Sequence, residues 1–405
     1  MSLNGKAHIV GAYEHPSRLA ENLSVARLHA DVARGALEDA GLTKDDIDGY
    51  FCAGDAPGLG TTQMAEYLGL KLRHVDSTEC GGSAPILHVA HAAEAIAAGR
   101  CHIALITLAG RPRAAMAEAQ ARAAAAAGEG KPAKAPLALK APDPDEPNAA
   151  FERPYGPTTQ NLYGLVARRH MHEFGTTPEQ LAWIKVAASH HAQHNPHALL
   201  RKVVTVQDVL QSPMVSDPLH RLDCCVMTDG GGALIVARPE IARELKRPQV
   251  VVRGTGEAPK HAMGGRIDLT HSAALWSGRQ AFAEAGVSPA DMQYASLYDS
   301  FTITVLMQLE DLGFCKKGEG GRFVADGNLI SGVGKLPFNT DGGGLCSNHP
   351  ANRGGITKVI EAVRQLRGEA HPAVQVPNCT WALANGIGGA LASRHTAATL
   401  ILERV

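Results

Sequence analysis

Residues 33–50 read ARGALEDAGLTKDDIDGY, and residues 278–295 read GRQAFAEAGVSPADMQYA. Each segment contains a helical run of apolar residues, a glycine at which that helix can end, a short acidic turn and the start of a strand. Gly41 of the first segment coincides with Gly286 of the second. This internal repeat predicts a duplicated α/β domain.

A second pair of similar segments follows in the same order. Residues 80–99 read CGGSAPILHVAHAAEAIAAG, and residues 349–368 read HPANRGGITKVIEAVRQLRG. Each has a short turn with Gly or Pro, then a helix and a closing Gly. Cys80 and His349 therefore begin matching helices, and we expect the two helix ends to converge if the halves pack about a pseudo-two-fold axis.

Apolar strands and helical runs alternate along the rest of the chain. Strands are predicted at 6–12, 102–110, 224–238 and 248–258, which indicates βα units and a largely parallel sheet. From residue 111 the chain becomes rich in Ala, Lys and Pro, which is typical of a solvated excursion. We predict an N-terminal half formed by residues 1–111 and 222–246, an inserted loop domain at 112–221 and a C-terminal half at 247–405.

Composition excludes several classes of protein. The 405 residues have a net charge of −1, so there is no basic field for nucleic acid or an anionic membrane. No apolar run reaches the roughly 20 residues of a membrane span, and the first residues do not follow a signal-peptide pattern. We expect a cytoplasmic protein with eight free thiols, and near-neutral charge favours association into an oligomer.

Cys80 is the candidate nucleophile. A thiol at a helix N-terminus has its anion stabilised by the helix dipole, so the pKa of Cys80 is expected to fall. The imidazole of His349 could take the thiol proton. The competing interpretation is a buried, inert thiol.

Histidines are concentrated in SHHAQHNPH, residues 189–197. Asn-Pro ends the helix there and no cysteine or HExxH partner is near, so we predict a polar helix end and no metal site.

The motifs taken in order resemble the thiolase superfamily, and within it the sterol-carrier-protein-type thiolases and acetyl-CoA acetyltransferase-like relatives. They are STECGGSAPILHVAHAAEAIAAGRCHIAL, YGLVARRHMHEFGTTPEQLA, SDPLHRLDCCVMTDGGGALIV, YDSFTITVLMQLEDLGF and GGGLCSNHP. The resemblance implies a duplicated, five-layered αβαβα thiolase fold with an inserted loop domain. It also implies a homodimer, coenzyme A as substrate or product and no covalently bound cofactor. Cys80 would carry the acyl group, His349 would activate it, and the backbone N–H groups of Cys80 and Gly388 would form the oxyanion hole.

The chain departs from the family pattern at its second acid/base. Gly386 stands where many thiolases have a second catalytic cysteine. The HDCF motif of sterol-carrier-type members reads Tyr298-Asp299-Ser300-Phe301 here. Tyr298, Cys346 and a water molecule are the candidates for this role.

Tyr298 lies in the segment SLYDSFTITVLMQLEDLGF, residues 296–314, where a predicted strand gives way to a helix. Open α/β sheets place ligand-binding groups at such strand ends. The resemblance implies that the Tyr298 hydroxyl donates to a thioester oxygen or shuttles a proton. The alternative is an ordinary helix cap, with Asp299 capping the next helix.

The main hypothesis is that the protein cleaves or forms a 3-oxoacyl-CoA through an acyl-Cys80 intermediate. Its role would be degradative, toward lipid or aromatic compounds. Two alternatives stay open, a retro-aldol lyase acting on a CoA thioester with Tyr298 and a non-catalytic thiolase-fold subunit. The resemblance further implies a small zinc-ribbon/OB-fold partner protein.

Overall fold

The computed structural model describes residues 2–53, 56–127, 152–261 and 266–405. Within these residues the main sheet has nine strands in the order β3-β2-β4-β7-β1-β8-β11-β10-β9. Its strands are β1 (His8–Glu14), β2 (Gly49–Phe51), β3 (His74–Asp76), β4 (Ile103–Gly110), β7 (Gly230–Ala237), β8 (Val250–Lys260), β9 (Tyr294–Leu297), β10 (Trp381–Gly389) and β11 (His395–Arg404). The short strands β5 (Met214–Ser216) and β6 (Leu219–His220) form a separate pair.

The helices alternate with these strands. They are α1 (Val25–Ala40), α2 (Thr61–Leu68), α3 (Ala84–Ala97), α4 (Pro112–Ala127), α5 (Thr159–Phe174), α6 (Pro178–Ala192), α7 (Val206–Leu210), α8 (Pro239–Ala242), α9 (Ala274–Ala285), α10 (Thr302–Asp311), α11 (Gly320–Val324) and α12 (Gly355–Arg367).

The sheet consists of two similar halves that are joined by pairing of β1 with β8. In the first half β2 is parallel to β4, and β7 is antiparallel to β4 and β1. In the second half β9 is parallel to β10, and β11 is antiparallel to β10 and β8. The duplication is therefore confirmed. The prediction of a largely parallel sheet is wrong, because β7 and β11 each return against the direction of the strands on both sides of them.

The first repeated segment folds the same way in both halves. α1 and α9 end at Gly41 and Gly286, whose φ angles of 69° and 71° lie in the left-handed region. Glycine adopts that conformation without a Cβ clash. A short 3-10 turn with a capping box follows each helix and leads into β2 or β9.

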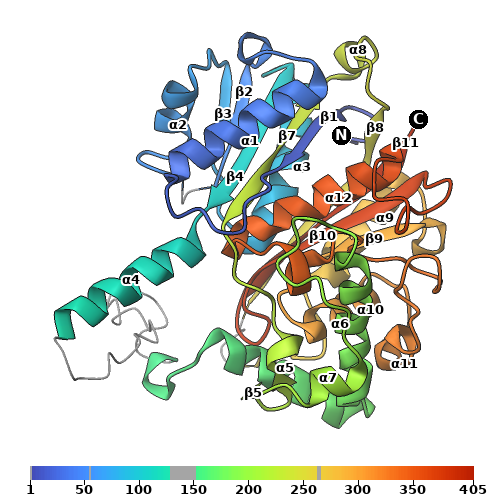
Figure 1. Cartoon of the computed structure of the whole chain (residues 1–405). Coiled ribbons are helices and arrows are strands. Elements are labelled where there is room, and N and C mark those ends of the chain that lie inside the picture. Colours follow the sequence, from blue (N-terminus) through green and yellow to red (C-terminus); the bar gives the residue numbers. More distant parts are fainter. Residues whose placement is uncertain (1, 54–55, 128–151, 262–265) are drawn as a thin grey trace.

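α3 and α12 form the central layer between the two halves of the sheet (Figure 1). α3 contacts β4 and also β10 and β11, while α12 contacts β1 and β7 and also β9 and β10. α1 covers the outer face of the first half and α9 that of the second half. β4 and β7 are buried along their whole length because helices cover both of their faces. These are the five layers that the resemblance implies.

The segment predicted as an insertion leaves the body of the protein along α4, which projects outward in Figure 1. Residues 128–151, which include most of its Ala-, Lys- and Pro-rich part, lie outside the described residues. α5 and α6 return and pack on α10. The division into halves and a loop domain at residues 112 and 222 remains our proposal.

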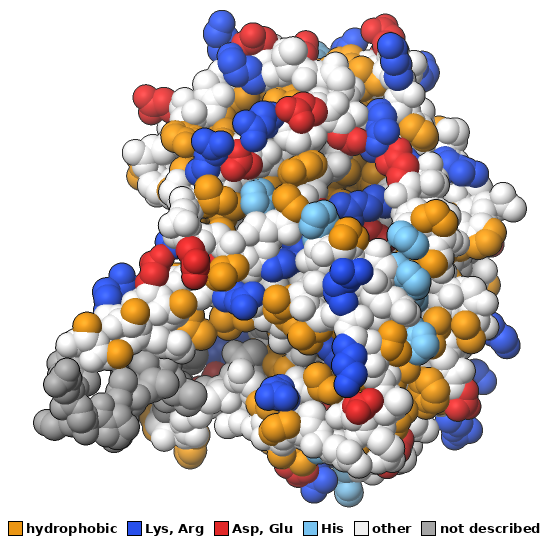
Figure 2. Space-filling model, viewed as in Figure 1, with side chains coloured by type: hydrophobic (Ala, Val, Ile, Leu, Met, Phe, Trp, Pro, Cys, Tyr) orange, Lys and Arg blue, Asp and Glu red, His pale blue; other side chains and the backbone are white. Residues whose placement is uncertain are grey.

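The surface carries basic, acidic and apolar side chains mixed over the face in Figure 2, with several histidines across its middle. Among the helices of the described ranges, none has the length and apolar character needed to cross a membrane.

Replacing Ile360 in α12 by Ala tests the central layer. Ile360 is fully buried, so its truncation should lower the free energy of unfolding by about 2–5 kcal/mol. Urea denaturation measures this loss. Leu165→Ala on α5 is the control, since Leu165 is 57% exposed and should change stability by less than about 1 kcal/mol. Equal effects of the two substitutions would contradict this packing.

Candidate active site

The first turns of α3 and α12 meet at the contact between the two halves. Cys80 precedes a 3-10 turn, Gly81–Ser83, that leads into α3. A Cβ atom on Gly355, at the start of α12, would overlap the carbonyl oxygen of Gly82. A Cβ atom on Gly388 of β10 would overlap the carbonyl oxygen of Cys80. The convergence of the two helix ends, predicted from the repeat, is therefore confirmed.

Cys80 is partly exposed and its backbone is held from both halves. Its carbonyl oxygen accepts hydrogen bonds from Ser83 Oγ at 2.8 Å and from Thr396 Oγ1 at 3.1 Å. Burial, followed by the charges of Glu79 and Glu257, raises the pKa of the Cys80 thiol, although a hydrogen bond from Thr396 acts in the opposite direction. The prediction of a lowered pKa is wrong, because burial and these carboxylates outweigh the helix end. The resting thiol is protonated and needs a base.

His349 has the properties of that base. Burial lowers the pKa of His349 to about 4, against the opposing charge of Asp299, so its imidazole is neutral at pH 7. Its Nε2 atom is buried and has no hydrogen-bond partner among the described residues. Its ring centroid lies 5.5 Å from that of Tyr298, with the rings tilted by 59°.

Tyr298 lies directly after β9, against the turn that carries the nucleophile. A Cβ atom on Gly82 would overlap Cζ of Tyr298, so the phenol ring packs on this turn. Gln308 Nε2 donates to the carbonyl oxygen of Tyr298 at 2.6 Å. Burial, followed by the nearby thiol of Cys225, raises the pKa of Tyr298 well above its usual value. The phenol keeps its proton and can act as a donor.

Asp299 does not cap the following helix, so that alternative is wrong. Helix α10 has Phe301 as its N-cap, without a side-chain hydrogen bond. Asp299 instead accepts hydrogen bonds from the N–H groups of Gly344 at 2.8 Å and Leu345 at 3.1 Å. Its Oδ1 also lies 2.8 Å from Nζ of Lys358 on α12. Burial opposes ionisation, but the charge of Lys358 lowers the pKa of Asp299. The Asp299 carboxylate thus holds the loop that precedes His349 against helix α12.

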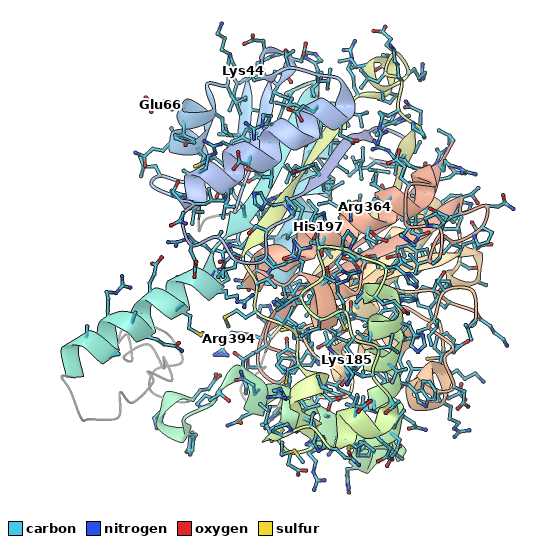
Figure 3. All side chains as sticks on the ribbon, in the orientation of Figure 1. Lys44, Glu66, Lys185, His197, Arg364 and Arg394 are labelled. Carbon is cyan, nitrogen blue, oxygen red and sulfur yellow. The ribbon has the colours of Figure 1, made fainter. Side chains whose placement is uncertain are left out.

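The candidates for the second acid/base have different surroundings. Cys346 is fully buried in the π-helical turn Gly343–Ser347, and burial raises its pKa. The ammonium of Lys185, labelled on α6 in Figure 3, interacts with Cys346 and donates to Leu345 O at 2.6 Å. At Gly386 a Cβ atom would lie 2.7 Å from Gly82 O, so the second cysteine of other thiolases has no room there.

Several residues of the site have no sequence signal that singles them out. They are Ser83 and Thr396 beside Cys80, Cys225 beside Tyr298, and Thr228 and Asn348 beside His349. Only the register of β10 with β11, which pairs Gly388 with Thr396, brings that threonine to Cys80.

Comparison with known proteins identifies the family of the chain. Residues 256–404 match the family described as Thiolase C-terminal domain-like. An acetyl-CoA acetyltransferase of Methanothermobacter thermautotrophicus is 33% identical over 391 residues, which are 95% of each chain. The chain belongs to the thiolase superfamily.

Other members of this superfamily with similar sequences carry different names. A 17-hydroxy-3-oxo-4-pregnene-20-carboxyl-CoA lyase of Mycobacterium tuberculosis is 33% identical over 377 residues, which are 90% of this chain and 92% of that one. The solved structure "Ltp2-ChsH2(DUF35) aldolase" matches with a TM-score of 0.85 and 31% identity, over 99% of this chain and 98% of that one. Membership of the superfamily is therefore compatible with both thiolytic cleavage and aldol cleavage.

Lys358→Met tests the buried ion pair. The substitution leaves the Asp299 charge without its cation, so the free energy of unfolding should fall by about 3–5 kcal/mol. Urea denaturation measures this loss in the Lys358→Met variant and in the double variant Asp299→Asn, Lys358→Met. The double variant should recover part of the lost free energy of unfolding. Arg34→Met is the control because the Arg34 side chain is 64% exposed in its ion pair with Asp31, and the substitution should cost less than about 1 kcal/mol. A Lys358→Met variant as stable as the control would refute the role of the pair.

Proposed function

We propose that the protein is a thiolase-type acyltransferase that cleaves a 3-oxoacyl-CoA through an acyl-Cys80 intermediate, in a degradative direction. One observation carries the proposal. The turn bearing the Cys80 thiol packs against Tyr298, and Tyr298 packs against the neutral imidazole of His349. A protonated thiol and a neutral base are the starting states that such a nucleophile requires.

The first half-reaction forms the acyl-enzyme. His349 accepts the thiol proton, and the sulfur attacks the C3 carbonyl carbon of the substrate. The N–H groups of Cys80 and Gly388 are our proposed donors to the resulting oxyanion. The bond between C2 and C3 then breaks, its electron pair moves to C2, and Tyr298 donates a proton there. The CoA thioester that contains C1 and C2 leaves, while the shortened acyl group, which begins at C3, stays on Cys80.

The second half-reaction releases that acyl group to coenzyme A. The Tyr298 phenolate takes the proton of the coenzyme A thiol, and the new thiolate attacks the acyl-Cys80 carbonyl. Cys80 leaves as a thiolate and recovers the proton held by His349. Both side chains thus return to their starting states. We assign this second acid/base role to Tyr298 in preference to Cys346, because Tyr298 packs on the turn of Cys80, whereas Cys346 lies in the buried turn beside Lys185.

A retro-aldol lyase is the second candidate. The position of Tyr298 against the Cys80 turn and the glycine at position 386 favour it, as do the lyase and aldolase names of two relatives. The presence of both Cys80 and His349 near Tyr298 speaks against it, since aldol cleavage needs no acyl-cysteine. A non-catalytic subunit is the third candidate.

Coenzyme A thioesters are our proposed substrates, with coenzyme A as product and co-substrate. We further propose a homodimer, a cytoplasmic location and a small zinc-ribbon/OB-fold partner protein. The partner proposal has support from the name of the solved aldolase, which joins two components.

Intact-protein mass spectrometry after incubation with acetyl-, propionyl- or benzoyl-CoA tests the proposed function. Wild-type protein should gain the mass of one acyl group with at least one donor. Cys80→Ala should lose the adduct, while the matched control Cys346→Ala should keep it. Absence of an adduct with every donor, also after addition of a candidate partner protein, would reject the acyltransferase and favour the lyase or the non-catalytic subunit.

A further inference from the structure

Thr228 holds the backbone of His349 from two sides. The segment predicted as a strand at 224–238 forms β7 only from Gly230, and Thr228 lies in the part that precedes it. The N–H of His349 donates to Thr228 Oγ1 at 2.8 Å, and the N–H of Thr228 donates to the carbonyl oxygen of His349 at 3.3 Å. Thr228 is fully buried, so water does not compete for these hydrogen bonds.

Asn348 extends this contact to an acidic residue of the first strand. Thr228 Oγ1 donates to Asn348 Oδ1 at 2.8 Å, and Asn348 Nδ2 donates to Glu14 Oε1 at 2.8 Å. Asn348 is fully buried, and Glu14 lies at the end of β1. The hydroxyl of Thr228 therefore has both an acceptor and a donor, which fixes its orientation.

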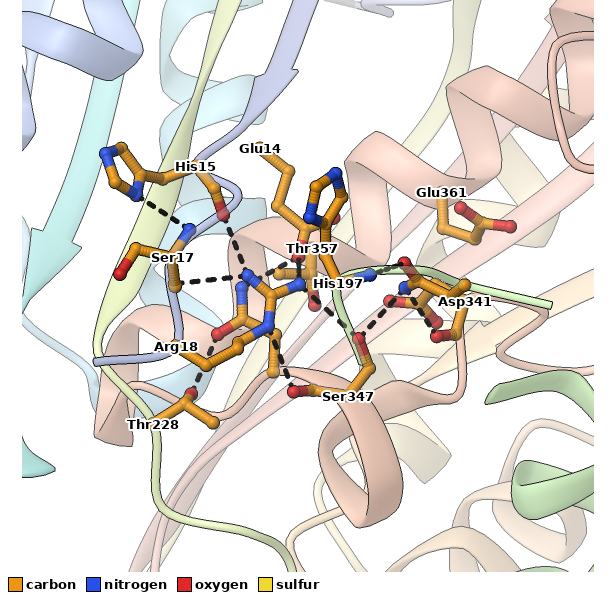
Figure 4. A network of polar contacts seen from close by, with 12 residues as sticks. Glu14, His15, Ser17, Arg18, His197, Thr228, Asp341, Ser347, Thr357 and Glu361 are labelled. Carbon is orange, nitrogen blue, oxygen red and sulfur yellow. Dashed lines mark hydrogen bonds and ion pairs between the residues drawn. The ribbon is translucent and has the colours of Figure 1, made fainter. Parts of the chain in front are cut away.

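Glu14 is itself fixed by two arginines. Arg18 Nη2 lies 2.7 Å from Oε1 of Glu14, and Arg364 Nη1 lies 3.1 Å from its Oε2. Burial alone would raise the pKa of Glu14, but the charges of Arg18 and Arg364 lower it to about 2. Arg18 Nε also donates to the carbonyl oxygen of Ser347 at 3.1 Å, and Figure 4 shows this network around Arg18. The chain of contacts thus runs from the ionised carboxylate of Glu14 to the backbone of His349.

This chain of contacts leaves one nitrogen of the imidazole ring, Nε2, free of hydrogen bonds within the described ranges. Thr228 is hydrogen-bonded to the main chain of His349, whereas Nε2 of His349 has no hydrogen-bond partner among the residues that the structure describes. A base that must accept and return a proton needs a fixed backbone and a free nitrogen. Small displacements of such a base slow proton transfer strongly, by roughly a hundredfold for about 1 Å.

We propose that Thr228 and Asn348 are positioning residues for His349, and that their hydrogen bonds hold its imidazole where it can deprotonate Cys80. This inference rests on the proposed function of His349 as the base. It adds to that function, because the hydrogen bonds that hold the base His349 lead through Asn348 to Glu14 in the first half of the chain.

Thr228→Val tests the proposal because valine keeps the shape of threonine and the backbone N–H but lacks the hydroxyl. The measurement is the rate of Cys80 alkylation by iodoacetamide at pH 7.5, followed by peptide mass spectrometry, which needs no acyl-CoA. Alkylation should be roughly tenfold slower in Thr228→Val than in wild type, and Thr228→Ser should restore it. Asn348→Leu, a change of similar volume, should slow alkylation as well and serves if Thr228→Val does not fold.

A double-mutant cycle separates positioning from general destabilisation. In a His349→Ala background Thr228→Val should have no further effect on Cys80 alkylation, because the base that it positions is gone. Equal rates for folded Thr228→Val and wild type, or the same loss with and without His349, would overturn the proposal. If His349→Ala alone left the alkylation rate unchanged, both the proposed function of His349 and this inference would fail, which distinguishes that case from failure of the positioning role alone.

Discussion

The buried ion pair between Asp299 and Lys358 constrains the loop on which the candidate chemistry depends. Both side chains are almost inaccessible to water, and such a pair is tolerated only where further hydrogen bonds satisfy the charges. The N–H groups of Gly344 and Leu345 supply them. The pair thereby ties the end of β9, the loop before His349 and helix α12 together. The position of His349 beside Tyr298 follows from this arrangement.

The site exists only where the two halves of the duplicated fold touch. One half supplies the thiol of Cys80 and the other the imidazole of His349. Glycines at 82 and 388 allow the two main chains to approach so closely that a side chain at either position would overlap an atom of the other half. Duplication of the domain therefore places two different side-chain groups, a thiol and an imidazole, at equivalent helix starts.

Local patterns predicted much of this, and long-range contacts account for what they missed. Helix stops at Gly41 and Gly286 are local, and they revealed the repeat and hence the convergence of the two helix starts. Asp299 also looked like a local helix cap, but its partners lie on segments distant in sequence. The rise in the pKa of Cys80 likewise depends on burial and on Glu257, which no local pattern brings near. Thr228 was missed because only tertiary folding pairs it with the backbone of His349.

A crystal structure of the wild-type protein soaked with an acyl-CoA donor would show whether Cys80 carries the acyl group. We expect an acyl group bonded to Sγ of Cys80, with its carbonyl oxygen between the N–H groups of Cys80 and Gly388. An intact thioester with its carbonyl oxygen on the Tyr298 hydroxyl and no bond to Cys80 would contradict this expectation.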